Sequence, residues 1–297
     1  MSAARCQLPL RREVLREVAS LLRGHIAELP VATSYETSCK ETSKGWRVVL
    51  DVSVWNYGEC KHDESDIEVV SPPIRNRADL AQLRKMMGAL QNIGGLSVTQ
   101  STGLHVHVGA GALNLQQLRV LAQHLIKYEM ALDMLVPAER RVGNFGGSTH
   151  SFIESNRHNR HFEKRKMTNL QVLKHLGSAP RIKTLVQWVN PNYSARYVVS
   201  LRRLVRDDCK RTIARKAMTV EFRQQVSTLD TTQLLAWVNF LVRVVSLAVA
   251  APAPTALPDQ TTGEAALKHM LHHLMRDDRA VDAYGGALHQ LRRTLKS

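Results

Sequence analysis

Four stretches of the chain alternate apolar and polar residues, the period of two that a β-strand shows when one of its faces is buried. These predicted strands cover residues 46–54, 66–74, about 98–108 and 218–226. Apolar residues recur instead with the 3.6-residue period of a helix over five stretches, roughly residues 9–29, 77–92, 116–135, 168–187 and 232–251. The pattern therefore predicts a protein of mixed helices and strands.

Each predicted strand has an apolar and a polar face, because neighbouring side chains of a strand point in opposite directions. In chain order, the polar faces carry Asp51 and Ser53, Glu68, His105 and His107, and Glu221 and Arg223. A sheet with helices over its apolar face and a polar opposite face is common among antiparallel architectures. We therefore expect an antiparallel sheet with helices on one face and these side chains on the other.

Carboxylates, imidazoles and a guanidinium on one face are suited to a particular chemistry. Carboxylate and imidazole groups together can bind a divalent metal, and carboxylates suit Mg²⁺ or Mn²⁺. An arginine beside a glutamate suits a phosphate held next to that metal. Taken singly, each motif also fits a solvated face or a cross-strand ion pair. The agreement of all four strands favours a metal and phosphate site, and a zinc-dependent hydrolase using the histidine pair and Glu68 is an alternative.

The charge of the chain adds a second alternative. Lys and Arg outnumber Asp and Glu by 41 to 26, which gives a net charge of +15 and attracts anions of any kind. Basic runs at residues 156–166 and 202–216 could form a nucleic-acid surface. Aromatic residues are only 5% of the chain and do not interleave with these runs, unlike a single-strand-binding surface. We therefore keep nucleic-acid binding as the lesser alternative.

The periodic pattern breaks at residues 251–265, which are rich in Pro, Ala and Thr. We predict one domain over residues 1–252, followed by a linker and a helical, basic C-terminal segment over residues 253–297.

The apolar stretch at residues 234–251 contains Asn239 and Arg243. A central arginine costs about 2.5–3.5 kcal/mol in a membrane span, so we expect a buried core helix and no membrane partner. The four cysteines are scattered without a Cys-x-x-Cys pair, which suits a reducing compartment and predicts a cytoplasmic protein.

Several motifs together resemble one known family. They are, in chain order, "GWRVVLDVSV", "IEVVSPPI", "TGLHVHVG", "VPAERRVGN", "SNRHNRHF", "SARYVVSL" and "TVEFRQQVSTLD". Over about residues 45–245 the sequence resembles the putative amidoligase family, which belongs to the carboxylate–amine ligases related to glutamine synthetase and glutamate–cysteine ligase.

The resemblance implies an α+β fold of the glutamine synthetase type, with a curved antiparallel sheet and the active site on its concave polar face. It implies a ligase that uses Mg-ATP to phosphorylate a carboxylate, after which an amine attacks the acyl phosphate to form an amide. The expected cofactors are ATP and Mg²⁺ (or Mn²⁺), and the expected partners are small-molecule or peptide carboxylates and amines.

The resemblance also implies roles for single residues. Glu68, His105 and Glu221 would be metal ligands, with His105 close to the γ-phosphate and Glu68 serving a second metal. His107 would lie nearer the nucleotide. The remaining roles fall to two arginines, both as catalytic residues: Arg223 would contact phosphate and nucleotide, and Arg196 would contact the phosphates or the substrate.

The sequence departs from the family pattern at its beginning. Members of the family usually begin with a Gly-x-Glu-x-Glu strand, and no Glu-x-Glu strand occurs upstream of Gly45. Gln225 also stands where the family more often has histidine, and "VVSL" follows "RY" where the family is expected to have Leu-Asn. Because the missing strand would carry metal ligands, we expect weak or no ligase activity for the chain as written.

Overall fold

The predicted strands fall into two three-stranded sheets rather than one. The computed structural model describes residues 7–33, 45–50, 67–98, 102–142, 153–191, 197–205 and 218–274. Within them, one sheet has the strand order β1 (Val31–Thr33), β2 (Trp46–Leu50), β3 (Ile67–Val70), and the other the order β4 (Gly103–Gly109), β6 (Thr219–Val226), β5 (Val199–Ser200). The α+β class is confirmed. The single sheet is not, because β2 pairs with β3 whereas β4 pairs with β6.

The contacts between residues divide the chain into two compact units. The first unit comprises residues 1–102, 210–215 and 229–231, and the second comprises residues 103–209, 216–228 and 232–297.

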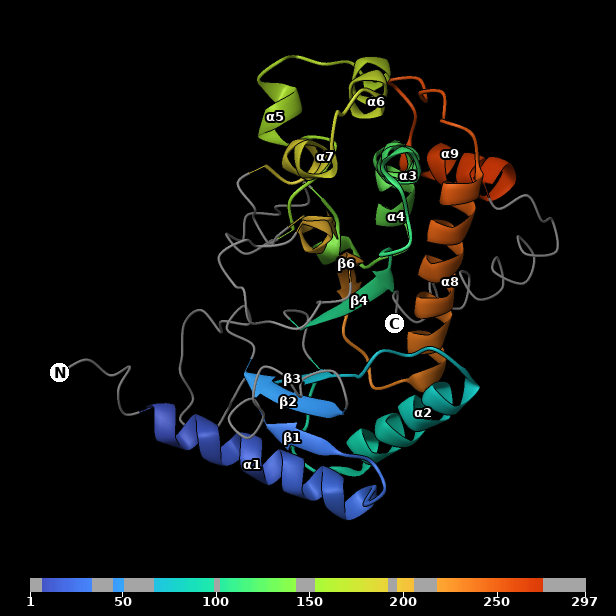
Figure 1. Cartoon of the computed structure of the whole chain (residues 1–297). Helices are drawn as coiled ribbons and strands as arrows, with labels where there is room; N and C mark the ends of the chain where they lie inside the picture. Colours follow the sequence, from blue (N-terminus) through green and yellow to red (C-terminus); the bar gives the residue numbers. More distant parts are fainter. Residues whose placement is uncertain are drawn as a thin grey trace. The chain divides into compact units, whose positions relative to one another are not determined.

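In the first unit, helix α1 (Gln7–His25) packs on β1 and β2 (Figure 1). Leu15 and Leu22 of this helix are fully buried, as is Val48 of β2. Strand β2 runs parallel to β1 and antiparallel to β3, and α2 (Arg77–Asn92) follows with its N-terminus capped by the Asn76 side chain. Of the apolar face that alternation predicted for the first strand, Val48 is buried and Leu50 is half-buried, whereas Val52 and Val54 lie outside the described residues. Asp51 and Ser53 lie outside the described residues.

The second unit holds the antiparallel sheet of β4, β6 and β5 among the remaining helices (Figure 1). Its α-helices are α3 (Leu115–Lys127), α4 (Glu129–Asp133), α5 (Arg160–Glu163), α6 (Asn169–Gly177), α7 (Ile182–Val189), α8 (Thr231–Ala250) and α9 (Gly263–His269). Its other helical turns are the 3-10 turns η2 (Ala138–Arg140) and η4 (Arg202–Leu204) and the π-helical turn η5 (Met270–Leu274).

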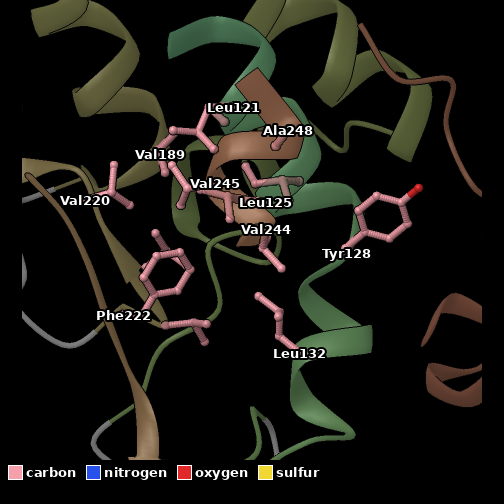
Figure 2. Close-up of a cluster of buried hydrophobic side chains, with 14 of the residues drawn as sticks. Leu121, Leu125, Tyr128, Leu132, Val189, Val220, Phe222, Val244, Val245 and Ala248 are labelled. Carbon is pink, nitrogen blue, oxygen red and sulfur yellow. The ribbon is translucent and has the colours of Figure 1, made fainter. Parts of the chain in front are cut away.

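The core of this unit forms where the apolar face of β6 meets the helices (Figure 2). Val220 and Phe222 point from β6 toward the side chains of α3, α4, α7 and α8. The labelled helical residues are Leu121, Leu125, Leu132, Val189, Val244, Val245 and Ala248. Full burial of such side chains is worth roughly 1.5–3 kcal/mol each, so this cluster anchors the strand that carries Glu221 and Arg223.

Two of the predicted helices are each divided in two. The stretch at 168–187 is interrupted between α6 and α7, where Pro180 cannot continue a helix because it lacks an amide hydrogen. The stretch at 116–135 breaks at Tyr128, whose φ of −104° and ψ of 15° end α3 before α4 begins. The helices expected at 77–92 and 232–251 are present with nearly the expected bounds.

Helix α8 is the one described helix that is long and apolar enough to cross a membrane by length and composition, criteria that a buried core helix also meets. One of its faces lies in the core of the second unit, including Trp237, Phe240 and Leu241.

The segment after α8 also enters this core. Helix α9 packs against α4, and Ala266, Leu267, Met270 and Leu274 are buried members of the same apolar cluster. The beginning of the segment is fixed by His124, whose Nε2 lies 3.0 Å from the carbonyl oxygen of Pro252.

Buried polar side chains connect the loop before α5 to the sheet. The carboxylate of Glu129, on α4, accepts hydrogen bonds from the Ser155 hydroxyl and from the amides of Asn156 (2.7 Å) and Arg157 (3.1 Å). The Asn156 side chain then donates to the carbonyl of Val199 (2.8 Å) and accepts from its amide (2.8 Å). This network explains the "SNRHN" part of the sequence as a structural motif that holds β5 beside β6.

Glu129 makes the stability of this network depend on pH. Burial raises the pKa of Glu129 from 4.5 to about 7, against the lowering effect of its hydrogen-bond donors. A carboxyl group whose pKa is higher in the folded than in the unfolded protein stabilises the fold below its unfolded pKa of 4.5. This stabilisation is lost as the pH rises through the folded pKa of about 7.

We therefore predict that, as the pH rises, the free energy of unfolding of the wild type falls relative to that of the Glu129→Gln variant. The Gln amide can keep two of the acceptor bonds and donate to Ser155, but it does not ionise. Urea denaturation of both proteins at several values between pH 4.5 and 7 measures the difference. Glu264→Gln, at an exposed position on α9, is the control and should follow the wild type. A difference between wild type and Glu129→Gln that stays constant with pH would contradict the prediction.

Candidate active site

The pairing of β4 with β6 brings four of the predicted site residues together. His107 lies opposite Glu221, and Val106 lies opposite Phe222. Val106, Val108, Val220 and Phe222 are buried in the apolar core, as the alternation predicted. The predicted division into an apolar and a polar face is therefore confirmed for these two strands.

Glu221 lies at the centre of the polar cluster. Its Oε1 accepts a hydrogen bond from Arg223 Nη1 and lies 3.7 Å from His107 Nε2 and 4.0 Å from His105 Nδ1. The side chain of Glu221 is 10% exposed, whereas those of His105 and His107 are 16% and 29% exposed. The carboxylate is thus largely enclosed by its partners, while the imidazoles remain within reach of a ligand.

The surroundings of His107 favour its neutral form. Its Nδ1 lies 3.2 Å from the Thr219 hydroxyl, at the start of β6. Burial lowers the pKa of His107 below 6.5; the cationic Arg203 and Arg223 lower it further, and the Glu221 carboxylate opposes them. A neutral imidazole keeps an unprotonated nitrogen that can bind a metal or accept a hydrogen bond.

Strand β6 is irregular beside this cluster. Leu104 pairs with Gln225 and Val106 with Phe222, so that two residues of β6, Arg223 and Gln224, lie opposite His105 alone. Such an extra residue is a β-bulge, which redirects the side chains around it. The bulge therefore helps to determine where the Arg223 side chain points.

The guanidinium of Arg140 lies at this bulge. It donates to the carbonyl oxygens of Arg223 (2.9 Å), Gln224 (3.1 Å) and Gln225 (3.3 Å). The sequence did not single out Arg140, although it belongs to the "VPAERRVGN" motif that supported the family resemblance. Arg203 was also missed, since within its basic run nothing distinguishes it from its neighbours.

Glu68 lies on β3, in the sheet of the first unit, where its side chain is half-buried. Arg196 lies outside the described residues. Among the residues with described positions, no group of three or more His, Cys, Asp or Glu side chains is arranged to hold a metal ion.

The charges of Glu221 and Arg223 should act on the pKa of His107 in opposite directions. Glu221→Gln removes the carboxylate that raises this pKa and should lower it further, whereas Arg223→Gln removes a cation and should raise it. Histidine ring signals followed by NMR through a pH titration measure both changes. Glu264→Gln should leave the pKa of His107 where it is. Equal values in the two site variants would mean that the cluster does not exist in solution.

The comparisons with known proteins agree with the motifs. The family model described as "putative amidoligase enzyme" matches residues 10–245, which include every strand of both sheets. No curated protein and no solved structure matches the chain. The match covers most of the sequence and confirms the resemblance carried by the histidine strand and the "TVEFRQQV" strand: the chain belongs to the putative amidoligase family.

Proposed function

We propose that the protein is an ATP-dependent carboxylate–amine ligase that forms an amide through an acyl phosphate, on a fold of the glutamine synthetase type. The observation that carries the proposal is the Glu221 cluster. It combines a carboxylate, two imidazoles and a guanidinium on the polar face of β4 and β6, within the part of the chain matched by the amidoligase family.

The proposed reaction has two steps. A carboxylate oxygen of the substrate attacks the γ-phosphorus of ATP; the bond from that phosphorus to the bridging oxygen breaks, and ADP leaves with the bonding electrons. The amine nitrogen then attacks the carbonyl carbon of the acyl phosphate, inorganic phosphate leaves with the electrons of the broken C–O bond, and the nitrogen passes a proton to that phosphate or to water. Neither step needs a protein nucleophile, so the task of the protein is to position the groups and to stabilise charge.

The ion pair between Glu221 and Arg223 suits that task. Without ligand, each group neutralises the other. In the proposed complex the pair separates, with the guanidinium turning to a phosphate oxygen and the carboxylate to a divalent cation. Arg203, whose charge acts on His107, would add positive charge on the phosphate side.

The proposal places a divalent cation at the cluster, because carboxylate and imidazole groups are donors that such ions accept. Glu221 and His105 would hold one such ion, Mg²⁺ or Mn²⁺, and Glu68 would serve a second. When bound, the ion supplies Lewis-acid stabilisation of phosphate charge. His107, whose pKa is lowered by burial, would face the nucleotide, and Arg196 would contact the phosphates or the substrate. The substrates in this proposal are a small-molecule or peptide carboxylate and an amine.

Thermal unfolding with and without Mg-ATP tests the proposal. A ligand at 100 times its dissociation constant stabilises a folded protein by about 2.7 kcal/mol, which is a measurable rise in Tm. We predict that the rise requires Mg²⁺ and disappears in Glu221→Ala. Glu264→Ala, outside the cluster, should keep it. A cooperative transition that Mg-ATP does not move in the wild type would contradict the proposal.

Two further measurements separate the alternative functions. Binding to nucleic acid that weakens steeply with salt and is unaffected by Glu221→Ala would favour a nucleic-acid-binding protein instead. Zinc retained through purification would favour a metal-dependent hydrolase. For a ligase, ADP release that depends on both an amine and a carboxylate is the direct assay.

A further inference from the structure

The hydrogen bonds that Arg140 makes to the backbone of β6 are unusual for a regular β-strand. Successive carbonyl groups of a regular β-strand point to alternate sides, so one side chain at its edge can reach every second carbonyl. Arg140 reaches three in succession, those of residues 223, 224 and 225. Three neighbouring carbonyls converge on one guanidinium only where the strand departs from regular geometry, and the register between β4 and β6 shifts at this point.

Arginine is well suited to this position. Its guanidinium is a rigid planar fork with five donors, so that it can bind several acceptors in a fixed arrangement, whereas the ammonium of lysine is a single point of charge. The two nitrogens used, Nε and Nη2, lie in one plane, and they fix the orientation of the bulged backbone relative to η2, where Arg140 lies.

Gly103 leaves room for this arginine. A Cβ atom at residue 103 would lie 2.9 Å from Arg140 Nη2 and 3.1 Å from His105 Nε2, and Cβ atoms essentially never approach other atoms more closely than 3.0 Å. At Gly109, which ends the same strand, an added Cβ would meet nothing within 4 Å. The first glycine of "GLHVHVG" therefore leaves the space that the Arg140 guanidinium occupies, whereas the second glycine has no such neighbour.

We propose that Arg140 is a positioning residue: by holding the bulge of β6, it directs the Arg223 guanidinium toward Glu221 and toward the phosphate that the cluster would bind. The bulge begins at Arg223 itself, so the backbone that Arg140 holds is the backbone from which that side chain leaves. The role in phosphate binding rests on the proposed ligase function, whereas the role in orienting Arg223 does not.

The first test therefore needs no substrate. In the wild type, the hydrogen bond to Glu221 should slow the exchange of the Arg223 guanidinium protons with water, which NMR of arginine side chains measures. In Arg140→Gln this exchange should become roughly tenfold faster, the ratio expected for the loss of one charge-assisted hydrogen bond. Arg140→Lys keeps the charge but not the fork, so it should not restore the slow exchange. Arg223 signals unchanged in both variants would overturn the proposal.

Gly103→Ala tests the same arrangement without altering the arginine. The added methyl group should displace Arg140 and accelerate exchange at Arg223, whereas Gly109→Ala should leave the exchange unchanged. This pair keeps the proposal testable if Arg140→Gln does not fold. Equal exchange rates in the two alanine variants would count against the proposal.

The second test uses Mg-ATP and a double-mutant cycle. If Arg140 acts through Arg223, Arg140→Gln should weaken Mg-ATP binding in the wild type but have no further effect in Arg223→Gln. Additive losses would show that Arg140 has a general effect on stability instead, and would overturn the positioning role. If the wild type does not bind Mg-ATP but its Arg223 exchange responds to Arg140→Gln, the ligase function fails and the orienting role of Arg140 stands.

Discussion

The antiparallel pairing of β4 with β6 is the constraint on which the second unit depends. Residues more than 100 positions apart in the sequence meet there, and the period of two gives both strands an apolar and a polar face at once. A slip of β4 by one residue would turn Val106 and Val108 out of the core and turn His107 into it. The same apolar contacts that stabilise the fold thus set the register of the charged cluster.

The third strand of that sheet is held in a different way. Strand β5 has only two residues, too few for backbone pairing alone to hold it. Asparagine side chains supply the missing hydrogen bonds: Asn156 binds both backbone groups of Val199, and Asn190 donates to the Val199 carbonyl and accepts from the Leu201 amide. Side-chain amides extend the sheet beyond its last regular residue, because an amide offers the same donor and acceptor as a peptide group.

Much of the fold and of the site could be predicted from alternation and helical period. Both depend on local spacing, so they placed His105 and His107 on one face and Glu221 and Arg223 beside them. Local spacing does not say which strands pair, and for that reason the first two predicted strands were assigned to the wrong sheet. It is equally silent on a bulge: the extra residue at Arg223 and Gln224 appears only relative to β4, and the contacts of Arg140 follow from it.

The packing of α9 and η5 has a practical consequence. The family match ends at residue 245, and a protein shortened to that point would look complete by comparison with its family. Yet Ala266, Leu267, Met270 and Leu274 lie within the same apolar core as the strands, and without them the surface of α4 would face water. Removing these residues would create an apolar patch prone to self-association. The apolar core of the second unit therefore extends through Leu274, beyond the limit of the family match.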